Sequence, residues 1–301
     1  MIILLMGMLF APGGYLYAPV ETLAHSVLGA DAVQSAVEVF SSRVVFLTLF
    51  IVALIAWTLQ RQLDESAEFE ATKEAAKEKG EDTGLLHSFG LLLSNKVARR
   101  SVFFLAAIYL TWNLVASVMG FFMPHIYETA GGLSNETANM LSCISWVFVV
   151  VTTFIISFFV DKVAHRFFYV FGLAAALSAW VLIIGGGVST IAGIWVFTIL
   201  WGINNGSSVQ IFYALWGSEL FPAKFRAGAQ GLMFFIVRGL SAVWGLVFTY
   251  IYGENGEGFT IAAYCMIVLL LISLIVGYIG CPNTRCRTLD SIAKERYGEE
   301  Y

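Results

Sequence analysis

The chain has 301 residues, of which 58% are hydrophobic and 13% are charged, whereas soluble globular chains carry about 25% charged residues. Aromatic residues make up 15% of the chain, which suits surfaces that face lipid and the membrane interface. With a net charge of −4 and no stripe of basic residues, the composition excludes a nucleic-acid-binding protein and predicts an all-α membrane protein.

Eight apolar runs have about the 17–25 residues that a helix needs to cross a bilayer. They predict transmembrane helices near residues 2–19, 44–60, 101–123, 138–160, 167–185, 190–215, 229–252 and 259–280. A long charged segment, 62–98, separates the first two spans from the other six. Within it, an Ala/Glu/Lys-rich run and a leucine-rich run at 85–93 predict amphipathic helices, the second along the inner membrane surface.

The lysines and arginines predict the orientation of the spans. All of them except Arg43 and Arg238 lie in the tail, 281–301, or in loops and flanks on one side of an alternating topology. The loops on the opposite side hold none. Because basic residues concentrate on the cytoplasmic side, we expect both termini to lie in the cytoplasm.

Chemistry-bearing side chains are sparse in the spans. The four cysteines are scattered, so we predict neither a disulfide framework nor a metal site, and no cofactor. No nucleophile, histidine or metal-ligand set gathers at one membrane depth, so the sequence does not indicate an enzyme.

Polar residues within the spans mark cavities or helix contacts, because polar groups are costly in hydrocarbon. Asn113 and Ser117 share one face of the span at 101–123 by i, i+4 spacing. The span at 190–215 carries a glycine-broken polar stretch that is typical of a discontinuous helix. We take as candidate substrate-binding residues, with helix packing as the alternative, Asn113, Ser117, Asn204, Asn205, Gln210 and Tyr213.

Arg238 lies about ten residues inside the span at 229–252, with Ser241 and Gly245 on its face and Trp244 nearby. Inserting a single arginine into the membrane at that depth costs at least about 2.5–3.5 kcal/mol of free energy. No acidic residue lies in the interior of a predicted span to pair with it. Three partners remain open for Arg238: an acid group on the substrate, an acid outside this sequence, or a backbone carbonyl. We therefore add Arg238 and Trp244 to the candidate substrate-binding residues.

Four local patterns resemble those of the sugar porters, a branch of the major facilitator superfamily. The family carries Leu-Pro-Glu-Ser-Pro-Arg, Asp-Arg-x-Gly-Arg-Arg, Ser-Glu-[Ile/Leu]-Phe-Pro followed by Arg, and Pro-Glu-Thr-Lys-Gly-Lys-Thr-Leu-Glu-Glu-Ile. The corresponding stretches here are LDESAEF at 63–69, DKVAHR at 161–166, SELFPAKFR at 218–226 and PNTRCRTLDSI at 282–292. They occur in the family's order and at the family's topological places.

The resemblance implies a major facilitator superfamily fold read from its fifth helix onward. Residues 1–61 would be the last two helices of the N-terminal bundle, 62–98 the cytoplasmic linker, 99–280 the C-terminal six-helix bundle and 281–301 a cytoplasmic tail. Helices one to four would be missing, which indicates a truncated gene product or a start codon assigned too far downstream.

The implied function is secondary transport of a sugar, polyol or sugar acid across the cell membrane, by alternating access, coupled to protons, in a monomer. A transporter of another small organic anion and a non-functional fragment are the alternatives. Sugar specificity carries over poorly, because the family's seventh-helix glutamines have no counterpart near residues 109–113.

The cytoplasmic charges in these patterns have a separate implied role. In the family, such charges form a salt-bridge network that breaks during transport. The residues in the matching positions are Asp161, Arg166, Glu219 and Arg226. The alternative is that these charges only anchor the topology.

Overall fold

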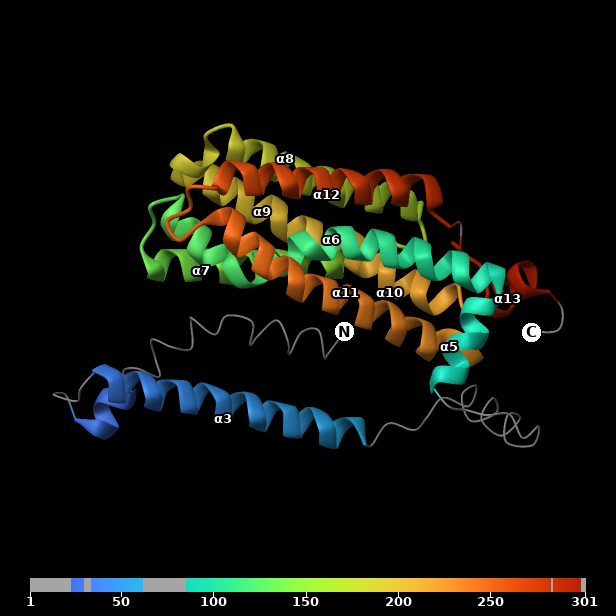
Figure 1. Cartoon of the computed structure of the whole chain (residues 1–301), viewed down its shortest axis with the longest axis horizontal. Coiled ribbons are helices and arrows are strands. Elements are labelled where there is room, and N and C mark those ends of the chain that lie inside the picture. Colours follow the sequence, from blue (N-terminus) through green and yellow to red (C-terminus); the bar gives the residue numbers. More distant parts are fainter. Residues whose placement is uncertain (1–22, 30–33, 62–84, 283, 299–301) are drawn as a thin grey trace.

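The structure is a computed structural model that describes residues 23–29, 34–61, 85–282 and 284–298 (Figure 1). The predicted span at 2–19, the Ala/Glu/Lys-rich helix and the pattern at 63–69 lie outside the described residues. The helices are α3 (Gln34–Gln60), α5 (Leu85–Ser94), α6 (Lys96–Thr129), α7 (Asn135–Ser157), α8 (His165–Ile184), η1 (Gly187–Ser189), α9 (Ile191–Ser207), α10 (Val209–Glu219), α11 (Ala223–Tyr252), α12 (Phe259–Gly280) and α13 (Leu289–Tyr297).

Each predicted span inside the described residues corresponds to observed helix. Within the described residues, six helices are long and apolar enough to cross a membrane: Ser42–Gln60, Lys96–Thr129, Asn135–Ser157, His165–Ile184, Phe225–Tyr252 and Phe259–Gly280. The span predicted at 190–215 is instead shared by α9 and α10, which follow one another with a break at Ser208. The predicted helical membrane architecture is therefore confirmed for this part of the chain.

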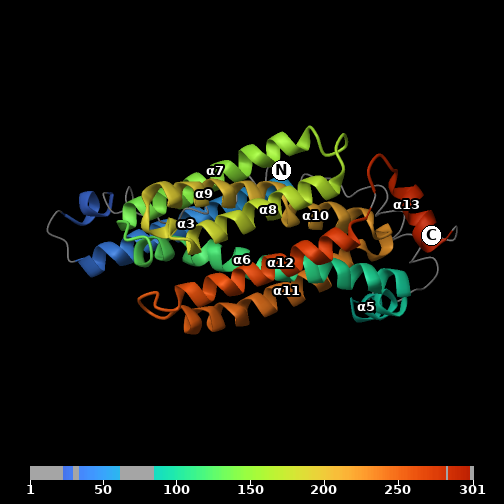
Figure 2. The same cartoon turned by 90° about the horizontal axis from the view of Figure 1, so that it is seen from above.

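Helix α6 forms the centre of the bundle. It packs against α7, α10, α11 and α12, while α8 packs against both α9 and α12, and Figures 1 and 2 show these helices running along one common direction. In the most apolar stretch of α6, half of the residues are buried. In the corresponding stretch of α3 none is buried, and α3 lies apart from the bundle in Figure 1. The largest buried side chains are aromatic and include Trp180, Trp216, Tyr109, Tyr127 and Tyr169.

Close helix packing at α9 depends on small residues. A Cβ atom on Gly202 would lie 2.6 Å from the backbone oxygen of Ser145, and one on Gly206 would lie 2.6 Å from that of Val149, both on α7. Such small residues let two membrane helices approach each other closely. Gly202 and Gly206 therefore serve helix packing between α7 and α9.

The tail folds back onto the end of the bundle that carries α5 and α13 in Figure 1. Arg296 donates to the Ser101 hydroxyl of α6 at 2.6 Å, and the Tyr297 hydroxyl donates to the Leu220 carbonyl at 3.0 Å. Arg285 donates to the Lys162 carbonyl at 3.2 Å. The segments that the sequence places on one side of the membrane therefore meet at this end.

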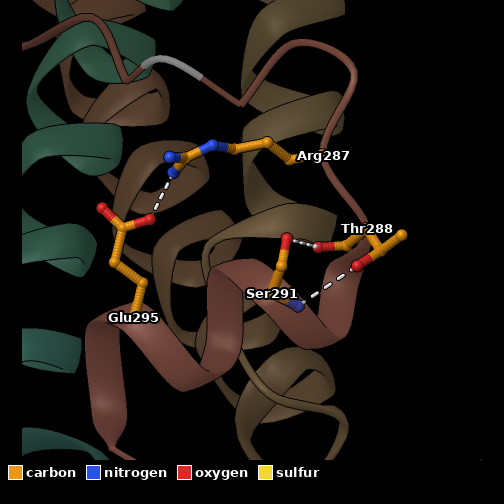
Figure 3. A network of polar contacts seen from close by, with 4 residues as sticks. All are labelled: Arg287, Thr288, Ser291 and Glu295. Carbon is orange, nitrogen blue, oxygen red and sulfur yellow. Dashed lines mark hydrogen bonds and ion pairs between the residues drawn. The ribbon is translucent and has the colours of Figure 1, made fainter.

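Helix α13 begins at a conventional N-cap. The Ser291 amide donates to the Thr288 hydroxyl at 3.3 Å, and the Ser291 hydroxyl donates to the Thr288 carbonyl at 2.8 Å (Figure 3). Arg287 also forms an ion pair with Glu295 (Figure 3). Because both charged side chains are about half exposed, this pair contributes at most about 1 kcal/mol.

Candidate functional site

The site is built around the break between α9 and α10. Ser208 has φ −117° and ψ −136°, so its backbone leaves the helical conformation, and its amide still donates to the Asn204 carbonyl at 3.0 Å. The polar, glycine-containing sequence predicted this discontinuity. Because α10 starts anew at Val209, its side chains Gln210 and Tyr213 take positions that a continuous helix would not give them.

Two stacked tyrosines form the aromatic part of the site. The rings of Tyr109 on α6 and Tyr213 on α10 lie 3.9 Å apart with an interplanar angle of 8°. Both side chains are buried, and neither hydroxyl has a hydrogen-bond partner in the described part of the chain. The Tyr109 hydroxyl lies beside the Gln210 amide and the Arg238 guanidinium. A buried hydroxyl without a hydrogen-bond partner is costly, and of these two tyrosines Tyr213 also lines a cavity between α10 and α11.

Asn113 lies one turn beyond Tyr109 and connects two helices. Its side-chain oxygen accepts a hydrogen bond from the Ser241 hydroxyl of α11 at 3.0 Å, and both residues are buried. Ser117, on the same face, donates to the Leu114 carbonyl of its own helix at 3.3 Å. Asn113 therefore fixes α11 against α6 next to the aromatic pair.

The two asparagines before the break use their side chains within the protein. Asn205 donates to the Trp201 carbonyl of its own helix at 2.9 Å. Asn204 is fully buried. In the amide orientation that satisfies both neighbours, its nitrogen donates to the Gly172 carbonyl at 3.2 Å and its oxygen accepts from the Trp112 indole N–H at 3.3 Å. These contacts favour helix packing, which was the alternative to ligand binding for this pair.

An open cavity of about 810 Å³ lies between α10 and α11. Its lining combines three polar side chains with an apolar wall: Tyr213, Gln230 and Arg238, together with Ala214, Ala227, Gly231, Phe234, Phe235 and Gly239. The Arg238 guanidinium lies 4.8 Å from the centre of the Phe234 ring. No described residue forms an ion pair with Arg238. The volume is in the range of small-molecule sites, about 300–1,000 Å³.

The structure thus brings Tyr213 and Arg238 to one cavity and places Gln210 beside the Tyr109 hydroxyl. Asn113 lies one turn from Tyr109 on α6. Trp244 lies elsewhere on α11, half-buried, with its indole nitrogen lacking a partner among the described residues. Sequence reasoning missed Tyr109 and Gln230 as members of the site. Both carried a signal, because each is a polar residue inside an apolar run.

The four charges that the sequence predicts to be cytoplasmic lie at the end of the bundle where the tail folds back. The Arg166 guanidinium lies 4.7 Å from the centre of the Tyr278 ring. Burial raises the pKa of the Glu219 carboxyl, a neighbouring Thr284 hydroxyl lowers it, and the charge of Asp161 raises it further. Among the described residues, no ion pair joins Asp161 or Glu219 to Arg166, and the salt-bridge network stays a prediction.

Antiparallel membrane helices, a discontinuous helix and an open cavity with a few polar side chains between α10 and α11 define a multi-pass membrane protein of the transporter class. The family model described as "Sugar (and other) transporter" matches residues 44–295. The chain therefore belongs to this family of sugar porters in the major facilitator superfamily, which confirms the resemblance seen in the four sequence patterns.

A relative in Bacillus subtilis (strain 168), the minor myo-inositol transporter IolF, is 36% identical over 283 residues. The match covers 93% of this chain and 62% of that relative. The chain thus spans less than two thirds of the length of the transporter that it matches.

Proposed function

We propose that this chain belongs to a secondary transporter that moves a sugar, polyol or sugar acid across the cell membrane by alternating access. Transport is coupled to protons, and the C-terminal tail lies in the cytoplasm. The protein works as a transporter and not as an enzyme.

One observation carries the proposal: polar groups converge at an open cavity. The Tyr213 hydroxyl has no hydrogen-bond partner among the described residues, and Tyr213 lines a cavity that also holds Gln230 and Arg238. Hydroxyl, amide and guanidinium groups together suit a ligand rich in hydroxyls. Family membership and the myo-inositol transporter among the relatives support the same class of substrate.

The arrangement of the helices supports the alternating-access part of the proposal. The cavity lies between α10 and α11 of the C-terminal bundle, and family members bind substrate near the membrane midplane between two bundles. The positive-inside rule supports the cytoplasmic placement of the tail, because the segments rich in lysine and arginine gather at the end where α13 docks.

The test is uptake of radiolabelled myo-inositol into proteoliposomes that contain the full chain, with and without an inward proton gradient. Uptake that rises with the gradient and falls with a protonophore supports the proposal. Uptake equal to that of empty liposomes for myo-inositol, D-glucose and D-glucuronate alike would refute it.

Two tyrosine variants link the uptake to this site. Tyr213→Phe keeps the ring that stacks on Tyr109 and removes a hydroxyl from the lining of the cavity. Loss of one hydrogen bond to the ligand should weaken apparent affinity by about 2- to 12-fold. Tyr264→Phe makes the same chemical change at an exposed side chain of α12 and should leave affinity unchanged.

A further inference from the structure

Arg238 lies near the middle of the membrane. In the span Phe225–Tyr252 it is roughly equally far from both ends, about 20 Å at 1.5 Å per residue. An arginine side chain cannot reach lipid phosphates over that distance. Its charge must therefore be compensated within the protein or by a ligand.

The described part of the chain offers Arg238 no negative partner. No ion pair with it is formed there, and its closest described ring contact is Phe234. Arg238 is also the sole charged residue among the side chains that line the cavity of about 810 Å³. The cavity therefore has a positive potential that attracts anions and repels cations.

The groups around the guanidinium are hydrogen-bond donors and acceptors without charge. The Tyr109 hydroxyl lies beside the Gln210 amide and the Arg238 guanidinium. Tyr213, whose ring stacks on that of Tyr109, brings its own hydroxyl to the cavity, and Gln230 adds an amide to the lining. A ligand that satisfies all of them has one acid group and several hydroxyls.

We propose that the cavity binds a monosaccharide with a carboxylate, such as a hexuronate, with Arg238 holding the carboxylate and Tyr213 and Gln230 holding hydroxyls. This inference rests on the proposed transport function and narrows its substrate class. It differs from the neutral cyclitol in the name of the matched relative. The planar guanidinium presents two parallel N–H groups, the geometry that a carboxylate accepts.

A neutral sugar fits these groups less well. It would occupy the hydroxyl-binding groups but would leave the guanidinium without a counter-charge in a cavity whose other wall includes Phe234 and Phe235. An unpaired charge that loses its water on binding weakens the affinity of that ligand. Charge should therefore discriminate between two sugars of the same shape.

The experiment uses the full chain in lipid nanodiscs and two labelled probes that differ at one carbon, D-glucuronate and D-glucose. We expect D-glucuronate to bind at least about tenfold more tightly. Arg238→Gln should weaken D-glucuronate binding by about 10- to 100-fold and leave D-glucose binding within about twofold. Arg238→Lys keeps the charge but not the paired N–H groups, so it should give an intermediate affinity.

A matched variant controls for loss of one positive charge and for misfolding. Arg99→Gln removes an exposed charge at the start of α6 and should bind D-glucuronate like the unaltered chain. The melting temperature of each variant is measured alongside, and Arg238→Lys tests the proposal if Arg238→Gln does not fold.

Three results would overturn the inference. The first is tighter binding of D-glucose than of D-glucuronate. The second is an equal loss of both probes in Arg238→Gln, as expected if Arg238 pairs with an acid of the protein. The third is D-glucuronate binding that Arg238→Lys and Arg238→Gln leave unaltered.

The outcome also separates this inference from the transport function. Uptake of myo-inositol without binding of D-glucuronate would keep the transport function and end the inference. Binding of D-glucuronate that depends on Arg238, with no uptake of any probe into proteoliposomes, would keep the inference and end the transport function.

Discussion

Replacing Gly202 by alanine should destabilise the bundle, because the added methyl has no room. Its Cβ would lie 2.6 Å from the Ser145 carbonyl oxygen and 2.6 Å from the Cβ of Phe148. Neither atom can move without a shift of α7, since one belongs to the backbone and the other is attached to it. Over-packing of this kind typically costs about 1–3 kcal/mol.

A second effect opposes that cost. Alanine is about 0.8–1.0 kcal/mol more favourable than glycine within a helix. Gly245→Ala makes the same replacement within α11, where no neighbouring atom lies within 4 Å of the new Cβ. Subtracting the stability change of Gly245→Ala from that of Gly202→Ala therefore cancels the gain in helix propensity. What remains is the packing cost, about 1–3 kcal/mol.

The assay is thermal unfolding of both variants and the unaltered chain in the same detergent, followed by tryptophan fluorescence. We expect the melting temperature of Gly202→Ala to fall below that of Gly245→Ala. Equal melting temperatures for the two variants would refute the close approach of α9 to α7.

The other predictions concern three polar contacts. Ser241→Ala should lower stability by about 1–3 kcal/mol, because it leaves the buried oxygen of Asn113 without its hydrogen-bond donor. Ser117→Ala removes a hydrogen bond within one helix and should lower stability less in the same unfolding assay. Tyr169→Phe should cost about 1 kcal/mol, since the Tyr169 hydroxyl donates to the Ser273 carbonyl of α12 at 2.8 Å, and an unaltered melting temperature would contradict that contact. Burial raises the pKa of Glu219, so the folded chain binds the carboxyl proton more tightly than the unfolded chain does. The stability that this proton binding contributes is lost as pH rises through the pKa of the folded state. Between about pH 7 and about pH 5, the unaltered chain should therefore gain stability relative to Glu219→Gln, and parallel pH profiles would disprove the burial effect.

Helix positions were predictable because each span is a long apolar run with polar ends. The break at Ser208 was predictable as well, since glycines and asparagines interrupt an otherwise apolar sequence there. The start of α11 was not predictable, because the helix begins at Ala223, six residues before the apolar run at 229–252. Amphipathic helix ends lack the apolar signal that marks a span.

The site was predictable only in part. Arg238 stood out because a charge in hydrocarbon is rare, and the structure places it in the cavity with Tyr213. The roles of Asn204 and Asn205 were not decided by sequence, because an asparagine that packs helices and one that binds a ligand look alike along the chain. Tyr109 was missed because its partner, Tyr213, lies on a helix far along the sequence.

The two walls of the cavity differ in how much they can change. At the break, Gly172 of α8 leaves no space, since a Cβ there would lie 2.5 Å from side-chain atoms of Ser207 and Ser208, so the bend that presents Gln210 and Tyr213 is clamped. On the opposite wall, Gly231 and Gly239 have no atom within 4 Å of a new Cβ. Evolution or design can therefore resize the cavity by enlarging residues on α11, whereas equivalent changes around the bend would disturb the frame that holds it.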